Sequence, residues 1–309
     1  MRRRRRPLLA AFAACAAALV LGAGVASAPA AAAPGCYERS AARVEAGVVD
    51  DGVDYFAARH FANPTCGAYD PERAEALYRR ALIHAGGRSI AAGYWALLRR
   101  EPALARRPGA PSAALLFRIA AVGSLSAGTP AKIRAAFAGT FHGAAPPEAF
   151  LVLEETLAAS QEARLSRLVA DAREEPLLRG AALSRCISPK DQVSAGTLFS
   201  CFLHQEEMAR GSLYPHIRDW ARDASEMLLY LLANRGHSDA LVHGARLLLA
   251  RGDVRSLEQA YRWLLWADAE HPGAAEVRAA LESRIPDSRR ALLRFDMEHG
   301  GFLTPISLD

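Results

Sequence analysis

The stretch from Ser238 to Ala280 constrains the fold of this chain more than any other part of its sequence. An apolar segment ends at Arg251-Gly252-Asp253, a second one runs over residues 257–267, and His271-Pro272-Gly273 separates it from a third. Gly and Pro combined with polar residues mark turns between periodic segments. The stretch therefore predicts helices that are joined by tight turns.

The composition extends this prediction to the whole chain. Of the 309 residues, 51% are apolar and only 7% are aromatic. The apolar residues are mostly Ala and Leu, which have the highest intrinsic preference for helices. Runs of alternating Val, Ile and Thr, which would indicate strands, are missing. We therefore predict an all-α fold.

Breaks at Pro and Gly divide the remaining chain into further expected helices. One of them begins clearly, because Asp70 stands at the capping position and Pro71 at the first helical position. It stops at Gly86-Gly87. The other expected helices cover residues 41–49, 53–61, 89–99, 112–123, 130–138, 147–158, 162–172, 177–186, 195–210, 216–232 and 287–299. We expect residues 302–309 to lie along the surface as a cap.

Residues 70–98 and 238–280 share one pattern of small and large side chains. Small residues let two helices approach closely, and large residues fill the space between them. Helix pairs that cannot bury their own apolar face must stack on one another. The expected packing residues are Ala74, Leu77, Tyr78, Ala81 and Gly93 in the first segment, and Gly244, Ala260, Trp263, Leu264 and Ala267 in the second.

This pattern resembles Sel1-like repeats, which are bacterial relatives of tetratricopeptide repeats. Each repeat of that family has a first helix that contains glycine, a loop that contains glycine, and a second helix of the form Ala-x-x-Trp-Tyr-x-x-Ala-Ala. In this chain Gly244 matches the first helix, Gly252 matches the loop, and residues 260–267 match the second helix. His243 stands where the family has Leu, and Asp268 where it has a second Ala. The resemblance implies a right-handed α-solenoid of stacked antiparallel helix pairs, irregular in the middle. It also implies an adaptor that binds another envelope protein, in exopolysaccharide secretion or in regulation.

The N-terminus has the layout of a secretory signal peptide. Arg2 to Arg6 precede an apolar run over residues 8–25, and small residues follow it. We expect a signal peptide over residues 1–33, a flexible lead-in over 34–52 and the helical repeat domain over 53–309. The expected location is periplasmic or secreted. The alternative is an inner-membrane anchor, since the apolar run is just long enough to span a bilayer.

The basic character of the chain comes from this N-terminus. Without Arg2 to Arg6, the 38 basic residues fall to 33, which equals the number of acidic ones. The remaining chain is formally neutral, so its charge gives no reason to expect a nucleic-acid partner.

Four cysteines remain after the apolar run: Cys36, Cys66, Cys186 and Cys201. An even number in an exported protein favours disulfides. Of the three pairings that four cysteines allow, proximity in the sequence favours Cys36–Cys66 and Cys186–Cys201. The alternative is four buried thiols, which would pack as small apolar residues. No two cysteines have the C-x₂-C spacing of a zinc site, and we expect no metal.

We find no catalytic motif and expect neither an enzyme nor a cofactor. His204 and Glu207 lie one helical turn apart, as in half a metal site, but the expectation is a solvated polar face. The expected partner-binding residues are Tyr94, Trp95, Arg246, Arg262 and Trp266, because aromatic residues and arginine anchor interfaces. Arginine-rich helix edges give an alternative, the binding of an anionic polysaccharide or peptidoglycan fragment. A hydrolase with an unrecognised site is the least favoured function.

Overall fold

The structure is a computed structural model that describes residues 36–142, 144–187 and 193–299. The chain divides into two units, Met1–Cys36 and Tyr37–Asp309, and all the helices below belong to the second. Sixteen α-helices and three short 3₁₀ helices form among the described residues, which contain no strand. This confirms the predicted all-α fold. The predicted signal peptide and the predicted cap over residues 302–309 lie outside the described residues.

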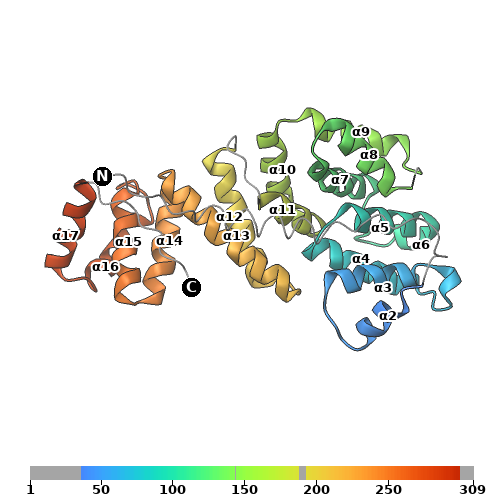
Figure 1. Ribbon diagram of the computed structural model, residues 1–309, viewed down its shortest axis with the longest axis horizontal. Coiled ribbons are helices and arrows are strands. Elements are labelled where there is room, and N and C mark those ends of the chain that lie inside the picture. Colours follow the sequence, from blue (N-terminus) through green and yellow to red (C-terminus); the bar gives the residue numbers. More distant parts are fainter. Residues whose placement is uncertain (1–35, 143, 188–192, 300–309) are drawn as a thin grey trace, which may run out of the picture. The chain divides into compact units, whose positions relative to one another are not determined.

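Figure 1 shows the helices in chain order. They are α2 (Glu38–Glu45), α3 (Asp51–Phe61), η1 (Pro64–Cys66), α4 (Pro71–His84), α5 (Arg88–Arg100), α6 (Pro102–Ala105), α7 (Ala113–Ser124), η2 (Leu125–Ala127), α8 (Pro130–Thr140), α9 (Pro147–Ala158), α10 (Gln161–Glu174), η3 (Pro176–Leu178), α11 (Arg179–Cys186), α12 (Ala195–Gly211), α13 (Pro215–Asn234), α14 (Ser238–Arg251), α15 (Val254–Trp266), α16 (Ala274–Glu282) and α17 (Asp287–Glu298).

The helices begin and end where local chemistry places their ends. The Asp70 carboxylate accepts a hydrogen bond from the Arg73 amide at 2.9 Å, with Pro71 at the first position of α4. Asp253 caps α15 in the same way through the Ser256 amide. Gly252 ends α14 with a φ of 76°, which a glycine adopts without strain.

The first helix differs from its predicted position. Helix α2 covers Glu38–Glu45, several residues before the expected 41–49. Contacts with α3 account for its place, since Arg59 lies over the Tyr37 ring and Ala41 is buried. The short α6 was not predicted, because only four residues separate Glu101 from Arg106.

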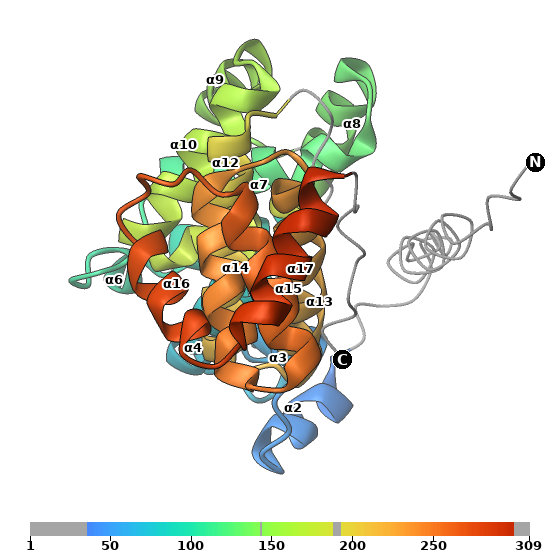
Figure 2. The same ribbon diagram turned by 90° about the vertical axis from the view of Figure 1, so that its left-hand side faces the viewer.

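Helices that follow one another in the chain pack together most often. The pairs α3–α4, α12–α13 and α14–α15 make close contact, while α7 reaches past α8 to pack on α9. Figure 2 shows α17 against α15. One large apolar cluster joins α2 through α11, and a second one joins α10 through α17. Nine of the ten expected packing residues are buried, and Gly93 is half-buried.

Two of these packing residues are glycines that lie under an aromatic ring of a neighbouring helix. A Cβ atom on Gly244 would overlap the Trp263 ring, and one on Gly93 would lie 2.9 Å from the Tyr78 hydroxyl. A side chain at either position would therefore push the ring away. The absence of a Cβ sets the distance between α14 and α15 and between α4 and α5.

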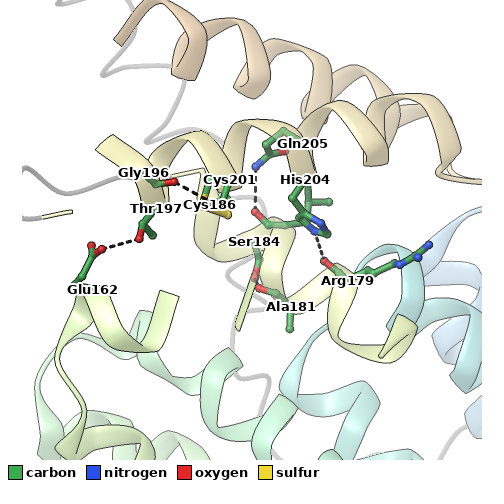
Figure 3. The surroundings of a disulfide bond; sticks show 12 residues. Glu162, Arg179, Ala181, Ser184, Cys186, Gly196, Thr197, Cys201, His204 and Gln205 are labelled. Atoms are coloured by element: carbon green, nitrogen blue, oxygen red, sulfur yellow. Dashed lines mark hydrogen bonds between the residues drawn. A yellow bond between two sulfur atoms is a disulfide. The ribbon is translucent and has the colours of Figure 1, made fainter. Parts of the chain in front are cut away.

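The predicted disulfide between Cys186 and Cys201 is confirmed. Figure 3 shows it joining the end of α11 to α12, where both cysteines are fully buried. Cys36 and Cys66 are disulfide-bonded as well. The alternative of four buried thiols is therefore wrong.

Replacing Cys186 and Cys201 together with alanine is expected to lower the free energy of unfolding by about 3 kcal/mol. The bond closes a loop across a separation of 15 residues, and its loss lets the unfolded chain gain entropy. Chemical denaturation of the double variant and the parent protein measures the difference. Equal midpoints and slopes for the two proteins would contradict the expected role.

Candidate functional site

Trp266, at the end of α15, is the one expected aromatic partner-binding residue that the structure classes as exposed. Its side chain is 44% exposed, whereas Trp263 is 2% exposed. Trp95 and Trp220 are partly buried against apolar clusters. Arg262 lies one turn before Trp266, so the two side chains share one face of α15. An indole beside a guanidinium combines apolar area with hydrogen-bond donors.

Arg246 faces a different neighbour. It lies on α14, and its guanidinium is 3.7 Å from the Glu276 carboxylate on α16. Half of the Arg246 side chain is exposed, so the ion pair is of the weak surface kind. The structure therefore joins Arg246 to α16, while Arg262 and Trp266 form the candidate surface on α15.

The structure removes Tyr94 from the expected partner-binding residues. Its side chain is fully buried, stacks on Tyr78 at 5.9 Å and donates a hydrogen bond of 2.9 Å to Glu75. Burial, with the nearby Glu75 carboxylate, raises the pKa of the Tyr94 hydroxyl. A ring without exposed surface cannot contact a partner, so its predicted role is wrong.

Trp95 also packs inside the protein. Its ring lies 5.4 Å from Phe141 and 5.6 Å from Phe117, in edge-on and tilted arrangements. The Arg99 guanidinium covers the ring at 5.4 Å. We therefore assign Trp95 to the aromatic core between α5, α7 and α8 and no longer to a partner surface.

The arginine-rich helix edges are largely matched by acidic neighbours. Arg107 pairs with Glu72 at 2.8 Å, and Arg79 lies 3.6 Å from Glu75. Arg289 makes a two-fold hydrogen bond with Glu258, at 2.6 and 2.8 Å. These pairs agree with solvated helix faces on which opposite charges alternate.

A buried polar network that the sequence did not predict joins α3, α4 and the residue that precedes α13. Asp54 is fully buried. It accepts hydrogen bonds from both the Arg80 guanidinium and, at 2.5 Å, the Tyr214 hydroxyl. Burial and the hydrogen bond to Asp54 raise the pKa of Tyr214, and the same carboxylate raises the pKa of Arg80. The network ties α3 and α4 to the start of α13 and acts as a clamp.

Histidines surround this clamp. The His84 ring meets the Tyr214 ring edge-on at 5.4 Å, and burial followed by Arg179 lowers the pKa of His84. His216 lies 3.0 Å from Asp51, and Asp50 is close enough for the three to hold a metal ion. Asp50 already caps α3 through the Val53 amide. We assign these carboxylates to the helix cap and the surface ion pair.

His204 is not on a solvated face, which corrects the expectation from the sequence. It is 4% exposed, and its Nε2 atom lies 3.0 Å from the Arg179 carbonyl oxygen (Figure 3). Burial lowers the pKa of its ring. Glu207 turns away to the Arg179 guanidinium at 3.3 Å, so the two side chains serve the junction of α11 and α12 separately.

A cleft of about 150 Å³ opens between α12, α13 and α14. Its walls combine buried apolar side chains with carboxylates and guanidinium groups. The lining residues are Phe202, Glu206, Arg222, Ser225, Glu226, Leu229, Leu247 and Arg251. The cleft could not be predicted from the sequence, because its walls come from three helices.

The membrane-spanning potential of the helices and three comparisons with known proteins complete the description of these sites. None of the helices in the described residues is long and apolar enough to cross a membrane. A scan against protein-family models found no match, and searches of the curated proteins and of the solved structures found none either. The resemblance to Sel1-like repeats therefore stays a prediction from the residues that carry it.

Proposed function

We propose that this protein is an exported helical scaffold that binds another envelope protein through the α15 surface around Arg262 and Trp266. We also propose that its helix pairs stack as a right-handed solenoid of the Sel1-like type. The close pairing of α3 with α4, of α12 with α13 and of α14 with α15 supports the repeated helix pair. Adaptor function is what the resemblance implies for such a scaffold.

The observation that carries the proposed interaction is the exposure of Trp266. The Trp266 indole is 44% exposed, so it contributes little to the packing of the core. Trp263, in contrast, fills the space beside Gly244. Exposed tryptophans are enriched among the residues that dominate binding energy. Arg262 on the same face adds a donor group of the type enriched at interfaces.

The disulfides support the proposed location. Bonds between cysteines persist in oxidising compartments and are rare in the cytosol. All four described cysteines are disulfide-bonded. Together with the arginine-led apolar run of the N-terminus, they support export to the periplasm or beyond. N-terminal sequencing of the exported protein tests this proposal.

The proposed interaction can be tested by affinity capture with a matched pair of variants. Trp266→Ala is expected to reduce retention of the partner from envelope extract by about tenfold or more, as loss of a dominant interface residue does. Leu151→Ala is the control, since Leu151 is 70% exposed on α9, away from α15 along the chain. The retained protein should be the same for parent and control.

Salt distinguishes protein binding from glycan binding. At about 1 M salt the screening length is about 3 Å, so an apolar contact around Trp266 should persist. Retention of an anionic polysaccharide through the arginine edges should be lost. Retention that is unaffected by Trp266→Ala and abolished by salt would overturn the proposal and support the glycan alternative.

A further inference from the structure

Arg185 carries a positive charge that the described part of the chain does not neutralise. It lies in the last turn of α11, next to the disulfide-bonded Cys186 that ties this helix to α12. Its side chain is only partly exposed. Its Nε atom is sealed from solvent and has no hydrogen-bond partner. The guanidinium group is therefore held in the structure with its hydrogen-bonding capacity unused.

The carboxylates on the helices that pack against α11 serve other groups. Glu162, on α10, accepts hydrogen bonds of 2.6 Å from two hydroxyl groups at the start of α12. Asp171, on the same helix, pairs with an arginine of α7. Glu174 is exposed at the end of α10, and Glu207, on α12, pairs with the first residue of α11. Within the described residues none of these four forms an ion pair with Arg185.

A second guanidinium group lies beside the first. It belongs to Arg164 on α10, which packs on α11. Burial, followed by the positive charge of Arg164, lowers the pKa of Arg185, so the two groups repel one another. One terminal nitrogen of Arg164 donates to the carbonyl oxygens of Thr156 and Leu157, at 3.1 and 3.5 Å. Its other nitrogens make no hydrogen bond in the described part of the chain.

Two neighbouring cations without a counter-charge are costly, and an anion from outside removes the cost. A cation that is partly withdrawn from water loses hydration, which only an acceptor or an opposite charge replaces. Guanidinium groups present paired N–H donors that match two oxygen atoms of a carboxylate or phosphate. Two positive charges favour a ligand with two negative ones, and a phosphate group carries about −1.5 to −2 at pH 7.

We propose that Arg185 and Arg164 together bind a phosphate group between α10 and α11, either as free phosphate or as a phosphate ester. The terminal nitrogens of Arg185 make the contact, because its Nε atom is sealed from solvent. Arg164 adds its charge and the donors that α9 does not use. The site is separate from the α15 surface of the proposed function and stands or falls independently of it.

Thermal unfolding of the full chain in sodium phosphate tests the proposal, with sodium chloride added to keep the ionic strength constant. A ligand of this size is expected to bind with a dissociation constant on the order of 1 mM. At about 10 mM phosphate the unfolding midpoint should then rise by about 3 °C. No saturable rise above the chloride reference would overturn the proposal.

A pair of arginine variants locates the site. Arg185→Gln is expected to weaken phosphate binding at least about tenfold, because a charge-assisted contact is lost. Without phosphate it should unfold at the parent's temperature or above, since it removes a charge that has no partner. Arg167→Gln is the matched control, because Arg167 is exposed on α10 one turn after Arg164. An undiminished phosphate response in Arg185→Gln would contradict binding at this site.

Arg164→Gln tests the second contact. It is expected to weaken phosphate binding about threefold or more, since the site keeps only one of its two charges. The same affinity in Arg164→Gln and in the Arg167→Gln control would show that Arg164 takes no part, and the proposed two-arginine site would be wrong.

Asp191 is the one acidic residue between α11 and α12, and it lies outside the described residues. Asp191→Asn is expected to leave the affinity for phosphate unchanged. A gain of about tenfold in this variant would show that the Asp191 carboxylate already neutralises the arginines. That result would overturn the proposal.

Two further ligands define the anion and its source. Acetate carries a single charge and should bind at least about tenfold more weakly than phosphate; equal affinity would contradict a site for a doubly charged group. Glycerol 3-phosphate carries the same group as an ester. If it binds as well as inorganic phosphate or better, the ligand is a phosphate ester. If it binds more weakly, the ligand is free phosphate.

Discussion

Replacing Asp54 with alanine is expected to lower the free energy of unfolding by about 4 kcal/mol. The change removes the acceptor of two hydrogen bonds from Arg80 and one from Tyr214. The Tyr214 side chain is fully buried, so its hydroxyl loses its partner and finds no water. Only 32% of the Arg80 side chain is exposed, so its charge regains only part of its hydration. A buried group left without its partner carries the full cost of desolvation.

Denaturant unfolding, followed by circular dichroism, measures this loss. Asp219→Ala is the control, because Asp219 and Arg222 are 70% and 60% exposed and lie 3.5 Å apart. A surface pair of this kind contributes less than about 1 kcal/mol. A double-mutant cycle with Tyr214→Phe separates the Tyr214 contribution. If Asp54→Ala cost no more than Asp219→Ala, the clamp would not stabilise the fold.

Replacing Trp263 with alanine is expected to cost about 4 kcal/mol of unfolding free energy, the usual range for removing a buried aromatic side chain. The Trp263 ring fills the space that Gly244 leaves open and meets the Tyr230 ring edge-on at 6.0 Å. Trp266→Ala is the control on the same helix. It removes a side chain that is 44% exposed and is expected to cost less than about 1 kcal/mol.

The contact between Gly244 and Trp263 can be tested by combining substitutions. Gly244→Ala alone should destabilise the protein by about 1 to 3 kcal/mol, because the new methyl group overlaps the ring. In the Trp263→Ala background the same change should be neutral or stabilising, since alanine favours the helix and fills part of the cavity. Additive effects of the two substitutions would contradict the proposed packing.

The helices could be predicted from the sequence because their signals are local. Caps such as Asp70 and Asp253 and stops such as Gly252 act within a few residues of the helix end. Apolar spacing likewise predicted the buried positions around Ala260 and Trp263. The prediction of an all-α fold needed no information from distant parts of the chain, whereas the prediction of disulfides also used the export signal at the N-terminus.

The surface residues were harder to predict, because burial depends on how many neighbours a helix has. Helix α5 packs against α4 on one side and against α7 and α8 on others. Tyr94 and Trp95 are adjacent and point apart, yet each meets a neighbouring helix. On α15, by contrast, 44% of the Trp266 side chain is exposed. The helical spacing of apolar residues in the sequence therefore does not distinguish the buried aromatic residues of α5 from the exposed Trp266 of α15.

The polar residues in the core did leave a signal in the sequence. Asp54 precedes Ala57, Ala58 and Phe61 at helical spacing, and these three residues are buried. An acid on such a face requires a partner from elsewhere. His204 shares a face with Cys201 and Met208 in the same way. The partners could not be predicted, since Arg80 and Tyr214 lie 26 and 160 positions from Asp54.

The hydrogen bond from Tyr214 to Asp54 also sets an order for folding. During synthesis α3 and α4 emerge early and can pair at once, because their contacts are local. The hydrogen bond from Tyr214 to Asp54 can form only later, because Tyr214 lies 160 positions further along the chain. Closing so long a loop carries an entropic cost. The N-terminal helices therefore reach their final stability only after the start of α13 has left the ribosome. A chain cut short before Tyr214 would keep the Arg80 partner of Asp54 but lack the hydrogen bond from Tyr214, and we expect it to be more open to proteolysis.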